Sequence, residues 1–309
     1  MAAKEAVAEQ AKKAAAETLA EKKKPRRRVA EMEVMIYDIR RDTPDTTTLF
    51  LFAGNEALTY EAGYFLTIDP HQFAELKHFT AHLEDLKGQR EKPRAYSLAS
   101  APHERLLAVT VKEEPYISGE TPYPPLISPL LAYHIPVGRR LIIKGFTGAY
   151  VMPEDITDRT DQIVHLCAGS GIVPNFSLIK ESLHRNDPLK HTLLYSSKTR
   201  QDIIYYEEFE ELHFQYPDKF DVIHCLTRED PAGIRNACKG RISAALVQQV
   251  IPDPSNVFAF SCGPGITPHE RKAARAKGEE PVPRFIEHMV QTLHQHGLGK
   301  KQIKQESWG

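Results

Sequence analysis

The sequence has few cysteines and none of the cysteine spacings that bind metals. Its cysteines are Cys167, Cys225, Cys238 and Cys262. They form no CxxC or CxxxxCxxC pattern, the kind of spacing that zinc and iron–sulfur sites use. The fourteen histidines include no HExxH pattern, and His294 and His296 stand two residues apart, a spacing that places them on different faces of a helix. We therefore expect reduced thiols and no metal site.

Long apolar runs are lacking as well. No run approaches the length of a membrane span, and residues 1–30 have no apolar centre of the kind that a secretory signal needs. These absences predict a cytoplasmic protein without a membrane span. The 309 residues are 41% hydrophobic and 26% charged, which is typical of a globular protein, and the length exceeds what one core usually fills. We expect two domains and a tail.

Charge is unevenly distributed along the chain. Residues 1–30 hold nine Lys or Arg, four Glu and many alanines, and they end in the basic run 22–28. This composition predicts a flexible tail or a frayed helix. The rest of the chain has 31 basic and 37 acidic residues, so a body of net charge −6 follows a tail of net charge +5. The tail could hold an acidic electron carrier, stay solvated or dock on its own body; nucleic acid is not expected.

Residues 34–153 contain short apolar runs with turns between them. The runs are 34–37, 48–52, 64–68, 107–111 and 141–144. They predict an antiparallel β-barrel or sandwich. One amphipathic helix is expected in the insert 69–92, with its apolar positions at Phe73, Leu76, Phe79, Leu83 and Leu86. Ordinary packing on the barrel is the favoured role of this helix, and covering a cofactor edge or a dimer contact is the alternative.

After Asp155 the pattern changes to alternating strands and helices. The expected strands are 162–167, 192–195, 221–226 and 257–260, and the expected helices start near 174, 207, 244 and 285. The alternation predicts a parallel sheet with helices on its faces, a Rossmann-like α/β domain. The predicted organisation is a tail at 1–30, an antiparallel barrel domain at 31–156 and an α/β domain at 157–309.

A glycine-rich turn joins the first strand of this second domain to its first helix. Gly169-Ser-Gly171 follows the strand, and Pro174 stands in the first helical turn. Glycines at such a place let backbone N–H groups approach a pyrophosphate at a helix N-terminus. The arrangement predicts a dinucleotide site, and a tight strand-to-helix turn without a ligand is the alternative.

The residues that follow the later strands of this domain indicate whether NADH or NADPH is the preferred coenzyme. In an NAD-binding sheet the second strand usually ends in Asp or Glu, whereas here Ser196, Ser197 and Lys198 stand at that place. Further hydroxyls and cations follow at Thr227, Arg228, Lys239 and Arg241. Such groups suit a 2′-phosphate and favour NADPH, with NADH possible and solvated loop tips as the alternative.

A short string in the first domain carries three groups that suit a flavin nucleotide. Arg94-Ala-Tyr96-Ser97 follows Pro93 and lies where a strand of the barrel is expected. An arginine can neutralise a pyrophosphate, a tyrosine can lie against a flat ring, and a serine hydroxyl can reach a ring nitrogen. In isolation such a string is weak evidence.

The motifs gain weight from their order. Arg94-x-Tyr96-Ser97, Gly145-x-x-Gly148, the Gly169 turn and Cys262-Gly263-Pro264, taken in sequence, resemble the ferredoxin-NADP reductase family over residues 34–309. Members of this family pair an FAD-binding antiparallel barrel with a nucleotide-binding α/β domain. The resemblance therefore implies FAD as a cofactor and NAD(P)H as the coenzyme.

The resemblance also implies roles for single residues of the barrel. Arg94 would bind the FAD pyrophosphate and Tyr96 would pack on the flavin. Ser97 would hydrogen-bond near flavin N5. Ser128 would make a second pyrophosphate contact, and Gly145 would belong to the cofactor site.

Four residues of the second domain receive roles in the same way. Cys262 would lie beside the nicotinamide C4, next to Gly263. The ending of the chain is similar to that of the plant-type members, so Glu306 would lie near the active site and Trp308 would stack on the flavin. The basic segment 266–284, between the Cys262 loop and the last helix, departs from the pattern and is a partner-docking element, a lid or a surface insert.

The predicted function is that of an enzyme. NADPH would give a hydride to FAD, and single electrons would pass to a separate carrier such as a ferredoxin, a flavodoxin or an oxygenase component. One alternative is an NADH-dependent reductase of an oxygenase or a small acceptor. Another is a non-catalytic flavin- or nucleotide-binding sensor subunit.

Overall fold

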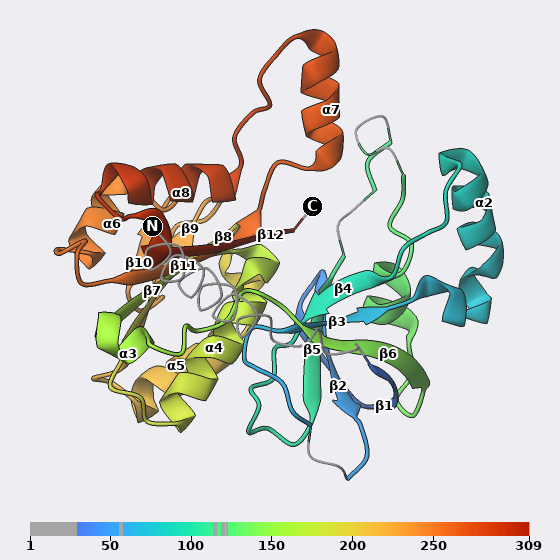
Figure 1. Cartoon of the computed structure of the whole chain (residues 1–309), viewed down its shortest axis with the longest axis horizontal. Helices are drawn as coiled ribbons and strands as arrows, with labels where there is room; N and C mark the ends of the chain where they lie inside the picture. The colour runs from blue at the N-terminus through green and yellow to red at the C-terminus, as the bar shows by residue number, and fades with distance from the viewer. Residues whose placement is uncertain (1–29, 56–57, 114–115, 119–120, 122, 309) are drawn as a thin grey trace, which may run out of the picture. The chain divides into compact units, whose positions relative to one another are not determined.

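The computed structural model describes residues 30–308 except 56–57, 114–115, 119–120 and 122. The tail predicted at 1–30 lies outside the described residues, apart from Ala30 at the start of the first strand. The described chain contains two six-stranded sheets (Figure 1). The two sheets confirm the predicted fold class, an antiparallel barrel followed by a parallel α/β sheet.

The first sheet is antiparallel and curled. Its strands are β1 (Ala30–Thr43), β2 (Thr46–Phe52), β3 (Phe65–Ile68), β4 (Arg94–Ser97), β5 (Leu107–Lys112) and β6 (Arg140–Thr147), in the order β4-β3-β6-β1-β2-β5. The chain leaving edge strand β4 reaches the other edge strand, because Leu98 forms an antiparallel bridge with Val109 and the Ala99 N–H donates to the Ala108 carbonyl at 2.7 Å. The sheet therefore curls toward a barrel.

Apolar side chains of these strands fill one common core. Ile36, Leu49, Leu66, Val109 and Ile143 are each fully buried in it. Side chains of a strand alternate between its two faces, so the short apolar runs of the sequence supply this core from every strand. Burying each such side chain stabilises the fold by roughly 1.5–3 kcal/mol.

The insert 69–92 is only partly the helix that its apolar spacing predicts. Helix α2 spans Lys77–Lys87 and ends at Gly88 in the left-handed region. Phe73 is buried but lies before the helix, between two short 3-10 turns, and Leu86 is 59% exposed. The predicted apolar stripe is therefore wrong at both ends, because Pro70 and the Asp69 cap start a separate turn and Leu86 faces away from the core.

The second sheet is parallel. Its strands are β7 (Gln162–Ala168), β8 (Lys190–Ser197), β9 (Phe220–Leu226), β10 (Ala237–Lys239), β11 (Phe258–Pro264) and β12 (Ile303–Trp308), in the order β10-β9-β8-β7-β11-β12. The helices of this half are α3 (Ile156–Arg159), α4 (Ile172–His184), α5 (Tyr206–Gln215), α6 (Ala244–Val250), α7 (Pro268–Lys277) and α8 (Phe285–Gln295). The carboxyl ends of parallel strands meet at the same edge of the sheet.

Helices cover both faces of the parallel sheet. Phe176 of α4 and Phe209 of α5 share a core with Leu193 of β8. Val247 of α6 and Met289 of α8 belong to a separate core on the other face, with strand residues that include Leu194. Neighbouring residues Leu193 and Leu194 of β8 thus face opposite layers, as expected for a strand of a parallel sheet that helices cover on both faces.

Four of the helices and strands described in this half were not predicted, namely α3, β10, α7 and β12. Helix α4 begins at Ile172, two residues before the predicted start at Pro174. None of the helices in the described part of the chain is long and apolar enough to cross a membrane. The boundaries 31–156 and 157–309 stay a prediction.

Candidate active site

The carboxyl edge of the parallel sheet gathers most of the predicted nucleotide residues. Cys262 of β11 pairs in register with Cys167 of β7 on one side and with Glu306 of β12 on the other. Gly169 follows the end of β7 directly. The sheet topology therefore brings the glycine turn, Cys262 and Glu306 together, although more than 90 residues of sequence separate the first two.

The backbone of Gly171 lies very close to the backbone of Cys262 and Gly263 at this edge of the sheet. A Cβ atom built on Gly171 would lie 2.1 Å from the Cys262 carbonyl oxygen and 2.7 Å from the Gly263 nitrogen. Gly169 adopts φ +53°, a left-handed conformation that favours glycine. The turn therefore lies directly against the Cys262 loop, and it opens the thirteen-residue helix α4. A helix N-terminus is a place where anions bind.

A buried hydrogen-bond network holds this turn from behind. The Asn175 side-chain NH2 donates to the Gly171 carbonyl at 3.0 Å, and the Tyr150 hydroxyl donates to the Asn175 side-chain oxygen at 3.1 Å. His165 Nδ1 lies 2.7 Å from the same oxygen, and His165 Nε2 lies 3.0 Å from His191 Nδ1. Burial lowers the pKa of His165 to about 4, so the network is uncharged at neutral pH.

Asn175 and Tyr150, the two residues that support the glycine turn, were not predicted from the sequence. The signal that could have found Asn175 is its place in the otherwise apolar start of α4, where a polar residue must find buried partners. Tyr150 carried no such signal, because it lies in the segment between β6 and α3 and its burial depends on the fold.

Asn175→Ala is expected to destabilise the protein by about 3 kcal/mol, because it removes the partner of a buried hydroxyl, of a buried imidazole and of the Gly171 carbonyl. Urea unfolding of the holoprotein measures this loss. The matched control is Asn256→Ala, which removes one exposed hydrogen bond to Asp161 and should cost less than about 1 kcal/mol. Equal losses in the free energy of unfolding for the two substitutions would show that the buried network stabilises the protein no more than one exposed hydrogen bond does.

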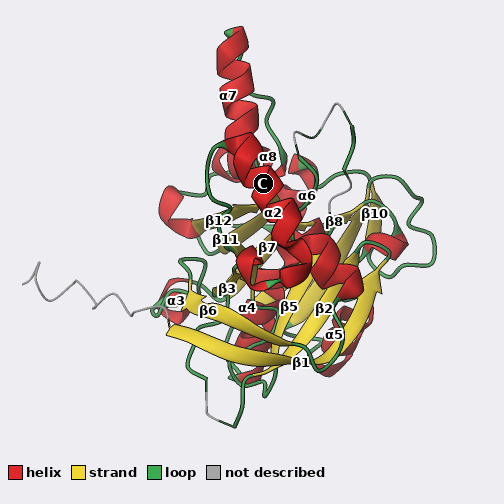
Figure 2. Ribbon diagram, turned by 90° about the vertical axis from the view of Figure 1, so that its right-hand side faces the viewer, coloured by secondary structure: helices red, strands yellow, loops and turns green. Residues whose placement is uncertain are grey.

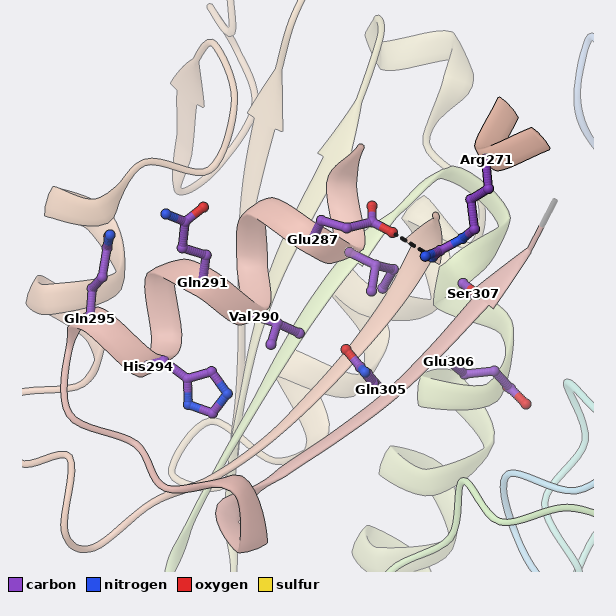
Figure 3. A pocket seen from close by; sticks show the side chains of 10 residues that line it. Arg271, Glu287, Val290, Gln291, His294, Gln295, Gln305, Glu306 and Ser307 are labelled. Atoms are coloured by element: carbon purple, nitrogen blue, oxygen red, sulfur yellow. Dashed lines mark ion pairs between the residues drawn. The ribbon is translucent and has the colours of Figure 1, made fainter. Parts of the chain in front are cut away.

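The carboxyl group of Glu306 lies at the end of β12 and, within the described part of the chain, lacks a hydrogen-bond partner at one of its oxygen atoms. Its Oε2 atom has no hydrogen-bond partner among the described residues. Burial raises the pKa of this carboxyl to about 7. Figure 3 shows Gln305 pointing from β12 toward α8, whereas the Glu306 side chain points to the other side of the strand. A half-buried carboxyl with a raised pKa at the end of a strand is a feature of functional sites.

The predicted flavin residues of the barrel lie on β4, next to β3. In register, Tyr96 pairs with Leu66 and Ser97 pairs with Phe65. The Ser97 hydroxyl is buried, and no described residue accepts or donates a hydrogen bond to it. Tyr96 packs on the barrel core, and burial raises its pKa. A buried hydroxyl without a partner fits a bound polar group.

Arg94 is already engaged by the protein. Its guanidinium pairs with Glu91 at 2.5 Å and donates to the Lys92 carbonyl at 2.6 Å. The Glu91 carboxylate is buried and also pairs with Lys87 at 2.5 Å. Arg94 nevertheless keeps 38% of its side chain exposed, so solvent still reaches part of it.

The remaining predicted barrel residues lie on separate segments. Gly145 is in β6, and a Cβ there would lie 3.2 Å from the Leu66 Cβ, so Gly145 and Tyr96 flank the same residue of β3. Ser128 is half-buried and lies just before the short helical segment Leu130–His134. The backbone of Trp308 pairs with Pro264, but its side chain lies outside the described side chains, so its stacking role stays a prediction.

The residues predicted for the coenzyme phosphate lie on adjacent loops. The Arg228 N–H donates to the Lys198 carbonyl at 2.8 Å, and the Thr227 N–H donates to the Ser197 carbonyl at 3.0 Å. The Gly240 N–H donates to the Leu226 carbonyl at 2.7 Å and brings the third loop alongside. This third loop carries Lys239 and Arg241. The side chains of Lys198, Arg228, Lys239 and Arg241 are exposed, whereas Ser196 is half-buried.

Among the residues that the structure describes, no group of three or more His, Cys, Asp or Glu side chains is placed to hold a metal ion.

The chain is similar to known proteins in sequence. Residues 166–268 match the family model described as the oxidoreductase NAD-binding domain. NADH-cytochrome b5 reductase 2 of Aspergillus niger is 34% identical over 131 residues, which cover 41% of this chain and 39% of that protein. The ferredoxin reductase component of the 3-ketosteroid-9-alpha-monooxygenase of Mycobacterium tuberculosis is 30% identical over 175 residues, which cover 56% and 42%. The chain thus spans about two fifths of the length of these relatives.

Solved structures share the fold of both sheets. The FAD/NAD-binding domain of a nitric oxide dioxygenase from Vibrio cholerae superposes with a TM-score of 0.67 at 19% identity, covering 90% of this chain and 98% of that one. A ferredoxin NADP+ reductase from Neisseria gonorrhoeae superposes with a TM-score of 0.64 at 19% identity, with the same coverage. At these identities the likeness shows the fold alone.

Proposed function

We propose that the chain is a member of the ferredoxin-NADP reductase-like family and acts as an NAD(P)H-dependent flavoprotein reductase. It transfers a hydride from NADPH to FAD and then single electrons to a separate carrier protein. The observation that carries this proposal is the strand register that sets Cys262 between the glycine turn and Glu306. A site for a nicotinamide coenzyme needs such a convergence of a phosphate cradle and polar groups.

The described residues fit both nucleotides. On the barrel, the Ser97 hydroxyl is buried without a partner among the described residues, and the backbone of Gly145 passes close to Leu66, since a Cβ there would lie 3.2 Å from the Leu66 Cβ. On the parallel sheet, the Gly171 turn leaves backbone N–H groups at the start of α4 for a pyrophosphate. A bound FAD would supply the redox chemistry, because a flavin takes a hydride and gives up electrons singly.

In the barrel half, the side chains bind FAD and orient its flavin ring. We assign Arg94 and Ser128 to the FAD pyrophosphate, Tyr96 to the flavin face and Ser97 to the flavin edge near N5. Trp308 covers the flavin until the nicotinamide takes its place. Positioning of this kind is the main contribution of a protein whose cofactors carry the reaction.

In the parallel-sheet half, three groups of residues contact different parts of the coenzyme. Gly169, Gly171 and Pro174 hold the pyrophosphate. Cys262 and Gly263 orient the nicotinamide, and Glu306 holds or releases a proton beside it. The residues assigned to the 2′-phosphate are Ser196, Lys198, Thr227, Arg228, Lys239 and Arg241.

Arg228→Ala is expected to weaken NADPH use by about tenfold and to leave NADH use within twofold, since an exposed guanidinium can pair with the 2′-phosphate that NADH lacks. An anaerobic titration that follows the visible flavin band with each coenzyme measures both. Arg90→Ala, at an exposed position in the barrel half, is the matched control. Equal losses for both coenzymes would contradict the phosphate contact.

An NADH-dependent reductase of an oxygenase or small acceptor is the second candidate function. It is favoured by the relatives that are named NADH-cytochrome b5 reductase. Bleaching of the flavin by NADH at lower concentration than by NADPH would support it. A yellow protein that neither coenzyme bleaches would instead indicate a non-catalytic sensor subunit. The cytoplasmic location predicted from the sequence stays a prediction.

A further inference from the structure

Helix α7 (Pro268–Lys277) is a ten-residue element that buries none of its residues. Figures 1 and 2 show it projecting from the parallel-sheet half, away from the other helices. Its ends are capped: the Thr267 hydroxyl accepts the Glu270 N–H at 3.0 Å, and Gly278 adopts φ +71° after the last turn. A helix of this length is marginal in water unless something holds it. Its own packing does not explain why it is there.

The base of α7 is held by one carboxylate of α8. Glu287 Oε1 accepts the Ile266 N–H at 3.0 Å, and Oε2 accepts the Arg284 N–H at 3.0 Å. Arg271 lies 3.7 Å from the same carboxylate (Figure 3), and Arg284 lies 3.5 Å from Glu270. Both ends of the segment 266–284 are thus fixed to the same point of the body. The helix is held at its base while its outer surface stays free.

The exposed surface of α7 is basic, whereas the body that carries it is acidic. The helix has Arg271, Lys272, Arg275 and Lys277 against Glu270 as its one acidic residue. Residues 31–309 together have a net charge of −6. Arg271, Arg275 and Lys272 lie within about one third of the helix circumference, at a spacing of 100° per residue. This patch therefore has a sign opposite to that of the molecule around it.

The position of α7 links it to the candidate active site. The helix begins four residues after Pro264, at the carboxyl edge where Cys262 and Glu306 lie. Gly265 packs so closely that a Cβ there would lie 2.7 Å from the Ser307 Cβ. Val282, in the segment that returns from α7, is 82% exposed. An exposed apolar residue five positions after Lys277 adds to the cations of α7 the mixed character of surfaces that transient protein contacts use.

We propose that α7, with Val282 in the segment that follows it, is the docking site of an acidic one-electron carrier protein. The inference rests on the proposed reductase function and names the surface by which that function reaches its partner. Opposite charges steer such a carrier to the helix and orient it, while a small contact area lets it leave after each electron. A projecting helix fits a protein surface better than a small anion, because its cations do not converge on one point.

The test is a charge reversal on the outer part of the helix, Lys272→Glu with Arg275→Glu and Lys277→Glu. Arg271 is left in place because it contacts Glu287. The acceptors are the soluble haem domain of a cytochrome b5 and a [2Fe–2S] ferredoxin, two acidic carriers, with ferricyanide as a small acceptor. We expect kcat/KM for at least one of the carriers to fall by about tenfold or more, with a weaker salt dependence, while ferricyanide reduction changes less than twofold.

Two further variants make the result specific. Lys190→Glu with Lys300→Glu and Lys301→Glu makes the same charge change near the amino ends of the parallel strands, opposite to α7, and should leave carrier reduction within twofold. Gln in place of Glu at the three α7 positions preserves the helix and should give a smaller loss in the same direction. Equal rates for wild type and both α7 variants with both carriers would overturn the proposal. Absence of ferricyanide reduction in the wild type would instead mean that the reductase function itself is wrong.

Discussion

Gly171→Ala is expected to lower flavin reduction by NADPH about 100-fold or more while the protein still binds FAD. The added Cβ would lie 2.1 Å from the Cys262 carbonyl oxygen, a distance that no real Cβ contact shows. Since the obstacle is backbone and not the end of a flexible side chain, either the glycine turn or the Cys262 loop must move. Displacement of a reacting group by about 1 Å costs about 100-fold in rate.

Stopped-flow measurement of flavin bleaching by NADPH, with the FAD content determined from absorbance, separates the two halves of this prediction. Gly299→Ala is the control, because a Cβ there meets only the Gln302 side chain, at 3.5 Å. A Gly171→Ala protein that bleaches at the wild-type rate would show that the coenzyme does not use this turn. A protein that also lost FAD would show that the substitution disturbs the barrel as well.

Glu306→Gln is expected to raise the melting temperature of the holoprotein at pH 8 by roughly 5 °C and to change it little at pH 4.5. The folded-state pKa of Glu306 is about 7 against an ordinary value of 4.5, because burial disfavours the charged carboxylate. Folding therefore takes up a proton between these two values, so stability falls as the pH rises from about 4.5 to about 7. Above pH 7 the full cost of about 3 kcal/mol is present, and glutamine escapes it.

Thermal melts at pH 4.5, 6 and 8 measure this difference. The control Glu279→Gln changes an exposed carboxylate and should shift the melting temperature by less than about 1 °C at each pH. The rate of flavin bleaching, followed over the same range, should show an inflection near pH 7 that Glu306→Gln removes. A Glu306→Gln protein that is less stable at every pH would mean that the carboxylate has a stabilising partner.

Glu287 shows how differently a second glutamate of the same half behaves. Burial raises its pKa, but backbone hydrogen bonds from Ile266 and Arg284 outweigh burial and leave the pKa below the ordinary value. This carboxylate fixes the base of α7 and is charged throughout the neutral range. The raised pKa of Glu306 thus reflects missing partners and not simply its place at the end of the chain.

Local patterns were enough to determine both halves of the fold. Helix α6 begins at the predicted residue, and β4 covers the Arg94–Ser97 string, because apolar spacing and turn residues act within a few positions of each other. The glycine turn was also readable, since a strand, two glycines and a helical proline follow each other directly. Residues that act through their neighbours in sequence could therefore be assigned before the fold was known.

Elements that depend on distant partners were decided by the tertiary structure. Strand β12 has no apolar alternation, and it exists because its backbone pairs with β11, which brings Glu306 beside Cys262. The partners of Asn175 come from β7 and from the segment before α3. Backbone pairing and burial depend on which parts of the chain contact each other in the folded protein. The raised pKa of Glu306 and the exposure of α7 could therefore not be predicted from the sequences of β12 and α7 alone.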